Sequence, residues 1–407
     1  MMTATKDNKS FYNNEIPEGW VMKELFSLGN VSSGGTPDTT NEIFWNGNVN
    51  WCTPTDITKL NGSKYIGETV VKISAAGLKN SSARLLPINS VIVCTRATIG
   101  KAAISVEEIS TNQGFKNIIP NEKKVNVEFL YYSIINSENK LLRLGNGSTF
   151  LEVPKSDFEK FKIPLPPLPE QKAIAKVLCA ADAAIHTTEK LIAKKVLRKK
   201  WLMQQLLTGK KRLKGFGGEW KEVPLSEMFS ERNETKYFDL PLLSIGQNGV
   251  YPQDESIKKD TSNDDKSKYK RICQGDIGYN TMRMWQGRSA LSGLEGIVSP
   301  AYTVVTPKKN ADSLFFSYLF KMPKMTNLFW RNSQGLVDDT LNCKYKDFSI
   351  VRVVLPQTKE EQTAIAQVLQ AADKEIRLLK AKAVKLREQK KGLMQVLLTG
   401  KVRLKIN

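Results

Sequence analysis

The chain has 407 residues, enough for two or more domains, and its hydrophobic content of 41% is sufficient for ordinary buried cores. No apolar run approaches the roughly 18 residues of a membrane span, and the polar start MMTATKDNKS lacks a signal-peptide core, so the sequence predicts a cytoplasmic protein with no membrane partner. A net charge of +20 favours a polyanionic partner, DNA or RNA above all.

Residues 1–167 are predicted to form one globular domain. Three β-type runs separated by turn residues lie at 90–95, 101–106 and 115–120. A helical pattern follows at 127–135. The stretch 32–57 is rich in Gly, Asn, Thr and Trp, so we expect a loop with some buried aromatic side chains. The domain ends in IPLPPLPEQ, whose prolines predict an extended segment.

A long helix is predicted next, at 168–214, and the chain repeats it at 358–407. Of the 45 residues in 170–214, 25 recur in 361–405 without a gap. The second copy has a coiled-coil seam whose members alternate four and three positions apart, namely Ile365, Leu369, Ala372, Ile376, Leu379, Ala383, Leu386, Lys390, Leu393 and Leu397. The first copy keeps this frame but has Thr188, Lys195 and Lys199 on its seam.

Start and stop signals agree with these helices. Thr358 and Glu361 suit a capping box, and Pro169 suits a first helical turn. Gly209 and Gly400 are placed as C-terminal caps. We therefore expect two struts that pair with each other, in preference to two ordinary core helices.

Most of the positive charge lies in the two repeats. Residues 170–214 carry a net charge of +9 and residues 361–405 carry +7, so the repeats hold +16 of the total of +20. A charged helix face is usually solvated. The basic struts are therefore expected to face nucleic acid, an acidic partner protein or water, and the sequence leaves these three open.

Residues 215–357 are predicted to repeat the plan of the first domain. When Pro120 is aligned with Pro307, four further pairs of residues align at the same offset. These pairs are Arg96 with Arg283, Gly100 with Gly287, Lys101 with Arg288, and Phe115 with Tyr302. A second helical pattern, SLFFSYLF, follows at 313–320, and KSDF at 155–158 matches YKDF at 345–348. The sequence thus predicts domain, strut, domain and strut in that order.

We predict an α+β protein with two globular, mixed α/β domains separated by two long helices. Two copies of one plan in a single chain favour a pseudo-two-fold symmetric arrangement in which the helices pair as an antiparallel coiled coil. Two DNA-reading domains related in this way suit two half-sites about one helical turn apart, roughly 34–36 Å. Because the domains differ in sequence, they should read different half-sites.

The residue inventory argues against a self-contained enzyme. The only histidine, His186, lies inside the first long helix and is expected at the surface. There is no GxxxxGK[ST] loop and no amino-methyltransferase tetrapeptide of the Asn/Asp-Pro-Pro-aromatic type. With one histidine and no CxxC pair among five scattered cysteines, we expect neither catalytic residues nor a bound metal.

Residues able to read DNA are easier to nominate. In the major groove, Arg contacts guanine, and Asn or Gln contacts adenine. The candidates in the first domain are Arg96, Lys101, Asn112, Gln113 and Lys116. Those in the second are Asn280, Arg283, Gln286 and Arg288. Trp285 is nominated for stacking, although a ring packed against its own loop is the stronger expectation.

The chain resembles the specificity (S) subunit of type I restriction-modification systems. Three features carry the resemblance: SGGTP…FWNGNVNW…DI near the start, PLPPLPEQKAIAKVL entering a helix, and LMQ-x-LLTGK-x-RL ending one. The last two occur twice in this chain. The second domain departs from the pattern by having PLLSIGQNGVY at 241–251 in place of SGGTP.

The resemblance implies target-recognition domains at 1–167 and 215–357, conserved spacer helices at 168–214 and 358–407, and no catalytic site in the chain itself. It also implies double-stranded DNA, two methyltransferase (M) subunits and restriction (R) subunits as partners. No cofactor is expected in this chain. S-adenosylmethionine would serve the M subunits in adenine methylation, and ATP and Mg would serve the R subunits.

Two other functions remain open at this level. One is a non-catalytic coiled-coil scaffold or regulator that binds nucleic acid without sequence preference, since it shares the charge and the struts. The other is a methyltransferase or nuclease acting alone, which the residue inventory disfavours.

Overall fold

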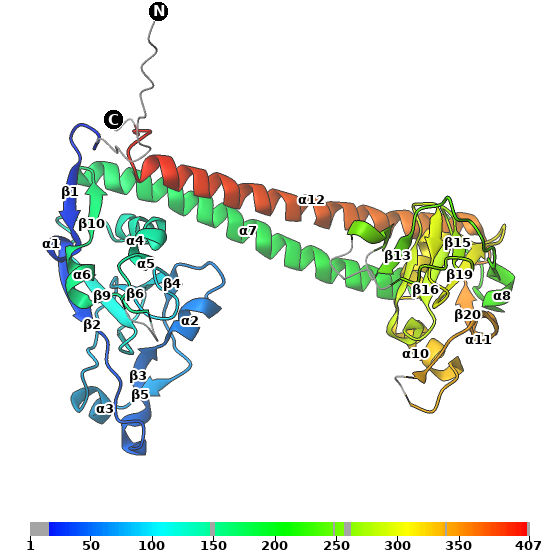
Figure 1. The fold of residues 1–407 in the computed structure, drawn as a ribbon, viewed down its shortest axis with the longest axis horizontal. Coiled ribbons are helices and arrows are strands. Elements are labelled where there is room, and N and C mark those ends of the chain that lie inside the picture. The colour runs from blue at the N-terminus through cyan, green and yellow to red at the C-terminus, as the bar shows by residue number, and fades with distance from the viewer. Residues whose placement is uncertain (1–15, 147–150, 247–248, 256–261, 338–339, 405–407) are drawn as a thin grey trace, which may run out of the picture. The chain divides into compact units, whose positions relative to one another are not determined.

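A computed structural model describes residues 16–146, 151–246, 249–255, 262–337 and 340–404, so the polar start MMTATKDNKS lies outside the described residues. The chain divides into two compact units. Unit 1 contains residues 1–188 and 382–407, and unit 2 contains residues 189–381. Each unit therefore joins one globular domain to a part of both long helices, α7 (Leu168–Leu206) and α12 (Lys359–Leu397) (Figure 1).

The elements of both units alternate short strands and short helices. Those of the first domain are β1 (Val21–Glu24), α1 (Leu25–Leu28), β2 (Gly29–Ser33), η1 (Glu42–Phe44), β3 (Trp45–Cys52), α2 (Pro54–Lys59), β4 (Tyr65–Ile66), β5 (Lys72–Ile73), α3 (Ala75–Lys79), β6 (Val91–Cys94), β7 (Ala102–Ser105), β8 (Ile109–Thr111), β9 (Phe115–Pro120), α4 (Val127–Asn136), α5 (Glu138–Leu142), α6 (Lys155–Lys160) and β10 (Lys162–Leu165). Those of the second are β11 (Lys221–Pro224), α8 (Leu225–Met228), β12 (Phe229–Glu231), β13 (Leu243–Gly246), β14 (Gly249–Pro252), η2 (Gln253–Glu255), β15 (Lys270–Ile272), β16 (Ile277–Asn280), η3 (Met284–Gln286), β17 (Ser289–Leu291), β18 (Gly296–Val298), β19 (Tyr302–Pro307), α9 (Ser313–Leu319), α10 (Pro323–Asn332), α11 (Tyr345–Ser349) and β20 (Arg352–Leu355).

The central sheets of the two units share one order over four strands, to which unit 1 adds β4 at one edge. Unit 1 has the order β2-β9-β6-β7-β4, and unit 2 has β12-β19-β16-β17. The entry strand also pairs with the exit strand in both, β1 with β10 and β11 with β20, each antiparallel. The predicted strands at 90–95, 101–106 and 115–120 are confirmed as β6, β7 and β9, and the predicted helix at 127–135 is confirmed as α4.

One local prediction was wrong. The stretch 32–57, expected as a loop, contains β3 and α2. Strand β3 pairs with β5 and β8, and its register shifts between Trp45 and Val49, where Asn46 has a positive φ of 56°. This bulge accommodates the three asparagines and the single glycine of the strand. The expected buried aromatic is present, since Trp51 is buried and meets the Trp45 ring edge-on.

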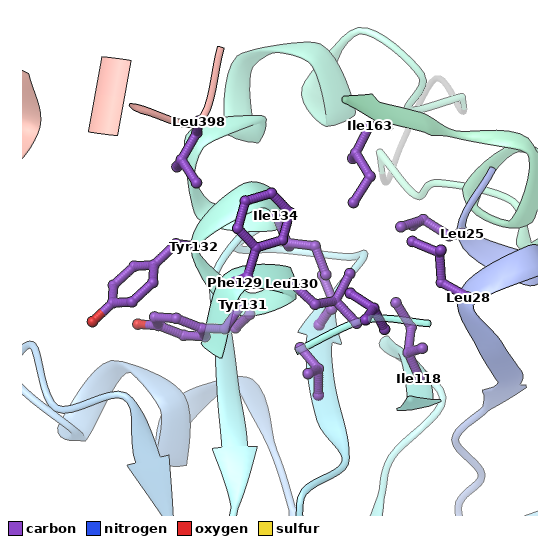
Figure 2. Close-up of a cluster of buried hydrophobic side chains, with 14 of the residues drawn as sticks. Leu25, Leu28, Ile118, Phe129, Leu130, Tyr131, Tyr132, Ile134, Ile163 and Leu398 are labelled. Atoms are coloured by element: carbon purple, nitrogen blue, oxygen red, sulfur yellow. The ribbon is translucent and has the colours of Figure 1, made fainter. Parts of the chain in front are cut away.

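Each core includes the end of a long helix. In unit 1, Leu397 at the end of α12 and Leu398 just after it join a cluster formed by α4, the central sheet and the start of α7; Figure 2 shows Leu398 among the residues of this cluster. In unit 2, Leu206 and Leu207 at the end of α7 join the equivalent cluster around Phe316. The repeated LLTGK sequence thus supplies the same two buried leucines to each unit.

The two long helices run antiparallel in both units. In unit 1, Lys390 lies 2.6 Å from Asp182. In unit 2, the Lys195 amine lies 2.5 Å from the Glu375 carboxylate, and the Lys199 amine lies 2.6 Å from the Asp373 carboxylate. A later residue of α7 thus contacts an earlier residue of α12, as it must when the helices are antiparallel. The seam lysines of the first copy therefore form ion pairs across the helix pair. They do not interrupt the pairing, which the sequence left uncertain.

The predicted helix ends are confirmed. Gly209 and Gly400 follow their helices with positive φ values of 70° and 71°, the left-handed cap conformation that favours glycine. The Thr358 hydroxyl accepts a hydrogen bond from the Glu361 amide at 3.4 Å. The Glu361 carboxylate instead binds Arg212, so only half of the expected capping box forms.

Candidate nucleic-acid interface

In unit 1 two of the candidate DNA-reading residues, Arg96 and Lys101, lie on the loop between β6 and β7. The loop closes through hydrogen bonds from the Gly100 amide to the Cys94 carbonyl and from the Cys94 amide to the Lys101 carbonyl, 3.0 and 2.8 Å long. Gly100 has a positive φ of 87°, and a side chain there would collide with Glu138. Ala97 is also left-handed, at 63°. This tight loop places Arg96, which is half-buried, at its base.

The neighbouring turn carries Asn112 and Gln113. The Asn112 side-chain oxygen accepts a hydrogen bond from the Gly114 amide at 3.0 Å, which fixes the turn. The Gly114 carbonyl accepts one from the Thr95 amide at 2.8 Å, which attaches this turn to the β6–β7 loop. Gln113 is exposed, and its side-chain oxygen accepts a hydrogen bond from the Thr36 hydroxyl. Two separate chain segments thus present polar side chains together.

The SGGTP motif supports that turn. A side chain on Gly34 would come within 1.8 Å of the Asn112 carbonyl oxygen, and one on Gly35 would come within 2.2 Å of Ser82. The Gly35 carbonyl also accepts a hydrogen bond from the Trp51 indole at 2.9 Å. Gly34 is therefore required by close packing behind the Asn112 turn, and Gly35 by close packing against Ser82 and Ala83.

A hollow of about 500 Å³ opens beside these segments. Arg96, Asn112 and Gln113 line it together with apolar residues. The complete lining is Pro54, Arg96, Ala97, Ile99, Asn112, Gln113, Gly114, Leu142 and Leu151. Sequence reasoning nominated three of these residues and missed the apolar wall. Leu142 and Leu151 come from segments far along the chain, and no local motif identifies them.

The two lysines nominated in unit 1 differ in environment. Lys101 is exposed at the end of the β6–β7 loop. Lys116 is only 4% exposed, and its amine lies 3.0 Å from the Glu152 carboxylate. That placement disfavours a direct DNA contact by Lys116, because its charge is buried and paired with a carboxylate. Lys116 instead attaches β9 to the segment that borders the hollow.

In unit 2 the equivalent loop joins β16 to β17. The Asn280 amide donates to the Arg288 carbonyl at 3.1 Å, and Gly287 has a positive φ of 74°, as Gly100 has in unit 1. Arg283 precedes the short helix η3, and Gln286 and Arg288 are exposed. The Asn280 side-chain oxygen accepts from the Met282 amide at 3.0 Å, which fixes the loop.

The predicted constant offset holds at the ends of the two loops, where Lys101 corresponds to Arg288, but the preceding strands β6 and β16 correspond at an offset one residue smaller. Six residues separate Cys94 from Lys101 and seven separate Asn280 from Arg288, so the loop of unit 2 is one residue longer. Trp285 donates its indole hydrogen to the Met282 carbonyl at 3.1 Å, as expected for a ring packed against its own loop.

The described residues show little that is typical of a catalytic centre. His186 is exposed on α7, as expected. Within the described ranges no group of three His, Cys, Asp or Glu side chains is placed to hold a metal ion. Burial raises the pKa of the Cys94 thiol to about 11 and that of Cys343 to about 12, so both stay protonated near neutral pH. Among the described helices, none has the length and apolar character needed to cross a membrane.

Comparison with known proteins identifies the family. The family model "Type I restriction modification DNA specificity domain" matches residues 17–195 and 218–388. These two stretches make up most of the chain, one in each half. The chain therefore belongs to the type I restriction-modification DNA specificity family.

Individual relatives are similar over part of their length. The MjaIX specificity subunit of Methanocaldococcus jannaschii is 35% identical over 178 residues, which cover 43% of this chain and 41% of that protein. The MjaVIII specificity subunit of the same organism is 28% identical over 306 residues, covering 68% and 70%. The EcoR124I/EcoR124II specificity subunit of Escherichia coli is 29% identical over 212 residues, covering 49% and 51%. The chain thus spans about half or less of two of these three proteins.

Two solved structures share the fold. The type I S subunit from M. genitalium superposes with a TM-score of 0.55 at 14% identity, covering 97% of this chain and 98% of that one. HsdS from Thermoanaerobacter tengcongensis gives 0.51 at 17% identity, covering 95% and 98%. These likenesses extend over both domains and both long helices.

Proposed function

We propose that the chain is the DNA sequence-specificity subunit of a type I restriction-modification complex and has no catalytic activity of its own. The observation that carries the proposal is the pair of corresponding loops, β6–β7 and β16–β17, each of which carries an arginine and ends in an exposed basic residue within a different surrounding sequence. Two domains that share a fold but carry different side chains on these loops suit a DNA target whose two halves differ in sequence.

Each unit reads one half of the target in this proposal. Arg96 and Arg283 are the leading candidates for paired hydrogen bonds to guanine, and Gln113 and Gln286 for contacts to adenine. Lys101 and Arg288 follow their loops at equivalent positions and are exposed, so they suit phosphate or base contacts. Asn112 and Asn280 have side-chain oxygens engaged within the turns, and their amide hydrogens are the groups proposed to meet DNA.

The partners follow from the same proposal. Two M subunits dock on the long helices and methylate adenine with S-adenosylmethionine, while R subunits supply ATP- and Mg-dependent cleavage. The helix pair sets the gap between the half-sites. The complex acts on double-stranded DNA in the cytoplasm. Every cofactor therefore belongs to another subunit.

Methylation mapping tests this function. Genomic DNA is compared from cells with and without this gene, both expressing the M subunit. The proposal predicts gene-dependent N6-methyladenine at one two-part motif with a fixed unspecified gap. If methylation by an active M subunit is indifferent to the gene, the proposed function is wrong.

The alternative of a sequence-indifferent nucleic-acid scaffold makes a different prediction. Its affinity would depend on salt and length but not on sequence. Equal binding to the mapped motif and to a scrambled duplex at fixed salt would favour that alternative.

A further inference from the structure

Two exposed leucines line the hollow of unit 1 beside its polar residues. Leu142 is 38% exposed and Leu151 is 42% exposed, and both lie around the hollow with Arg96 and Gln113. A concave surface that combines apolar side chains with a few hydrogen-bonding groups is typical of a binding site. Leu142 and Leu151, the leucine wall of unit 1, therefore indicate a ligand that has an apolar group as well as polar ones.

The chain holds Leu151 beside the β6–β7 loop. The Val153 amide, two residues further on, donates a hydrogen bond to the Thr95 carbonyl at 2.9 Å. A side chain at Gly145 would come within 2.5 Å of the Leu151 Cγ atom, so Leu151 packs directly against the backbone of that glycine. Leu151 is therefore fixed next to the loop that carries Arg96.

Leu142 reaches the same loop from helix α5, of which it is the last residue. The preceding residue, Leu141, is 1% exposed and anchors this helix in the core of unit 1. At the start of the helix, Glu138 lies so close to the β6–β7 loop that a side chain on Gly100 would come within 2.8 Å of it. The two leucines thus belong to different segments, and both segments pack on the loop that is proposed to read DNA.

Unit 2 places the corresponding leucine differently. The alignment of KSDF with YKDF matches Leu151 with Leu341. The backbone attachment recurs, because the Cys343 amide donates to the Thr281 carbonyl at 2.8 Å. Leu341 is nevertheless only 8% exposed. The second domain thus keeps the attachment but covers the leucine, so this apolar surface distinguishes unit 1 from unit 2.

One DNA base has the chemistry that the leucine wall requires. In the major groove, adenine, guanine and cytosine are recognised by hydrogen-bond donors and acceptors, whereas thymine adds a C5 methyl group to its O4 acceptor. Phosphate and sugar contacts are polar and would gain little from two leucines. Gln113, proposed above to contact adenine, lines the same hollow. Both bases of one A·T pair can therefore be read at this site.

We infer that unit 1 reads one thymine of its half-site through the C5 methyl group, which packs against Leu142 and Leu151. The inference rests on the function proposed above and names a base that the hollow recognises. It makes the leucine wall a specificity-determining part of unit 1, whereas unit 2 reads its half-site with the corresponding leucine covered.

The test is to remove the methyl group from the DNA. Each thymine of the mapped target, on either strand, is replaced in turn by deoxyuridine, and binding of the assembled M–S complex is measured by competition at fixed salt. One thymine in the half-site read by unit 1 should be sensitive. The affinity should fall about fourfold there, which is the effect of one buried methyl group.

Variants of the leucine wall show whether these side chains carry the effect. The double variant Leu142→Asn, Leu151→Asn keeps the side-chain size but removes the apolar surface, so it should bind the thymine and deoxyuridine duplexes equally. Leu142→Met with Leu151→Met stays apolar and should keep the preference for thymine. Leu85→Asn is the matched control and should also keep it, because Leu85 is likewise 42% exposed in unit 1 but is not among the residues that line the hollow.

Two results would overturn the inference and leave the proposed function intact. One is a target in which no thymine is sensitive to deoxyuridine, or in which the sensitivity survives in the Leu142→Asn, Leu151→Asn variant. The other is an equal loss of affinity by this variant for every duplex, which would place the leucines against sugar and phosphate. If the wild-type complex binds all sequences alike, the proposed function and this inference both fail.

Discussion

The guanidinium of Arg403 forms two hydrogen bonds with the carboxylate of Glu170, 2.5 Å from Nε to Oε1 and 2.7 Å from Nη2 to Oε2. In unit 2, Arg212 bonds Glu361 at the same two distances. Each arginine ends one copy of the long repeat, and each glutamate begins the other copy. The first and last parts of the repeat therefore recur because they form two equivalent ion pairs. Each ion pair joins the segment that follows one long helix to the first turn of the other long helix.

The residue after each glutamate completes the same attachment. The Gln171 side-chain oxygen accepts from the Asn126 amide at 2.8 Å, and Gln362 accepts from the Asp312 amide at 2.9 Å. Asn126 and Asp312 in turn cap the helices α4 and α9. The Glu-Gln dipeptide thus joins each domain to its long helices in the same way.

Replacing Arg212 with Ala should destabilise unit 2 selectively. The Glu361 side chain is only 3% exposed, and removing its partner leaves a buried, uncompensated carboxylate. We expect the free energy of unfolding of unit 2 to fall by about 3 kcal/mol. Urea denaturation followed by hydrogen exchange measures the change in each unit. The exposed neighbour Lys210→Ala is the control and should change little; equal losses from both variants would contradict this role of the ion pair.

Replacing Tyr132 with Phe should change the alkaline stability of unit 1. The Tyr132 hydroxyl donates to Asp182 at 2.5 Å, so losing it should cost about 1.5 kcal/mol at pH 8. Burial, and then the hydrogen bond to Asp182, raise the pKa of Tyr132. In the unfolded chain the pKa of a tyrosine is about 10. Above that pH the unfolded state loses this proton while the folded state keeps it, so the unfolded state is favoured and the stabilisation from Tyr132 declines.

The stability difference between wild type and Tyr132→Phe should therefore be constant below about pH 9 and shrink above about pH 10. Urea unfolding at several pH values measures it. Tyr318→Phe, which removes the equivalent bond to Asp373 at 2.7 Å in unit 2, is the matched control for unit 1. A difference that grows with alkaline pH would show that the sign of this coupling is wrong.

Replacing Gly34 with Ala should disturb the hollow of unit 1. The new methyl group would lie 1.8 Å from the Asn112 carbonyl oxygen and 2.4 Å from the Thr111 hydroxyl, so the turn that carries Gln113 must move. We expect about 1–3 kcal/mol of destabilisation, as for overpacking, and loss of recognition in one half-site. Gly67→Ala, which meets only side chains, is the control. Unchanged DNA recognition by Gly34→Ala would contradict the placement of this turn at the DNA surface.

The sequence predicted the elements whose signals are local. Strands β6, β7 and β9 and helix α4 have clear periodicity, and the caps at Gly209 and Gly400 need only their neighbours. Strand β3 was missed because its bulge at Asn46 accommodates residues that normally break strands. The missing information there is the pairing with β5 and β8, which is not local.

The candidate interface was predicted only in part for the same reason. The equivalence of Arg96 and Arg283 was predicted from one constant offset, but Arg96 is the second residue after β6 and Arg283 is the third after β16, because the loop of unit 2 is one residue longer. The burial of Lys116 depends on Glu152, which lies 36 residues away. The seam lysines appeared to interrupt the first helix because their partners, Asp373 and Glu375, lie in the other copy. Ion pairs of this kind cannot be assigned from one segment.

In the proposed function, each unit reads its own half of a two-part target. The most direct measurement is binding of the assembled M–S complex to the mapped duplex and to duplexes altered in one half only, for wild type, Arg96→Ala and Arg283→Ala. Each variant should lose about 1–3 kcal/mol and relax discrimination in one half-site, with the two variants affecting opposite halves. Uniform weakening on every duplex, or the same half affected by both variants, would contradict the claim.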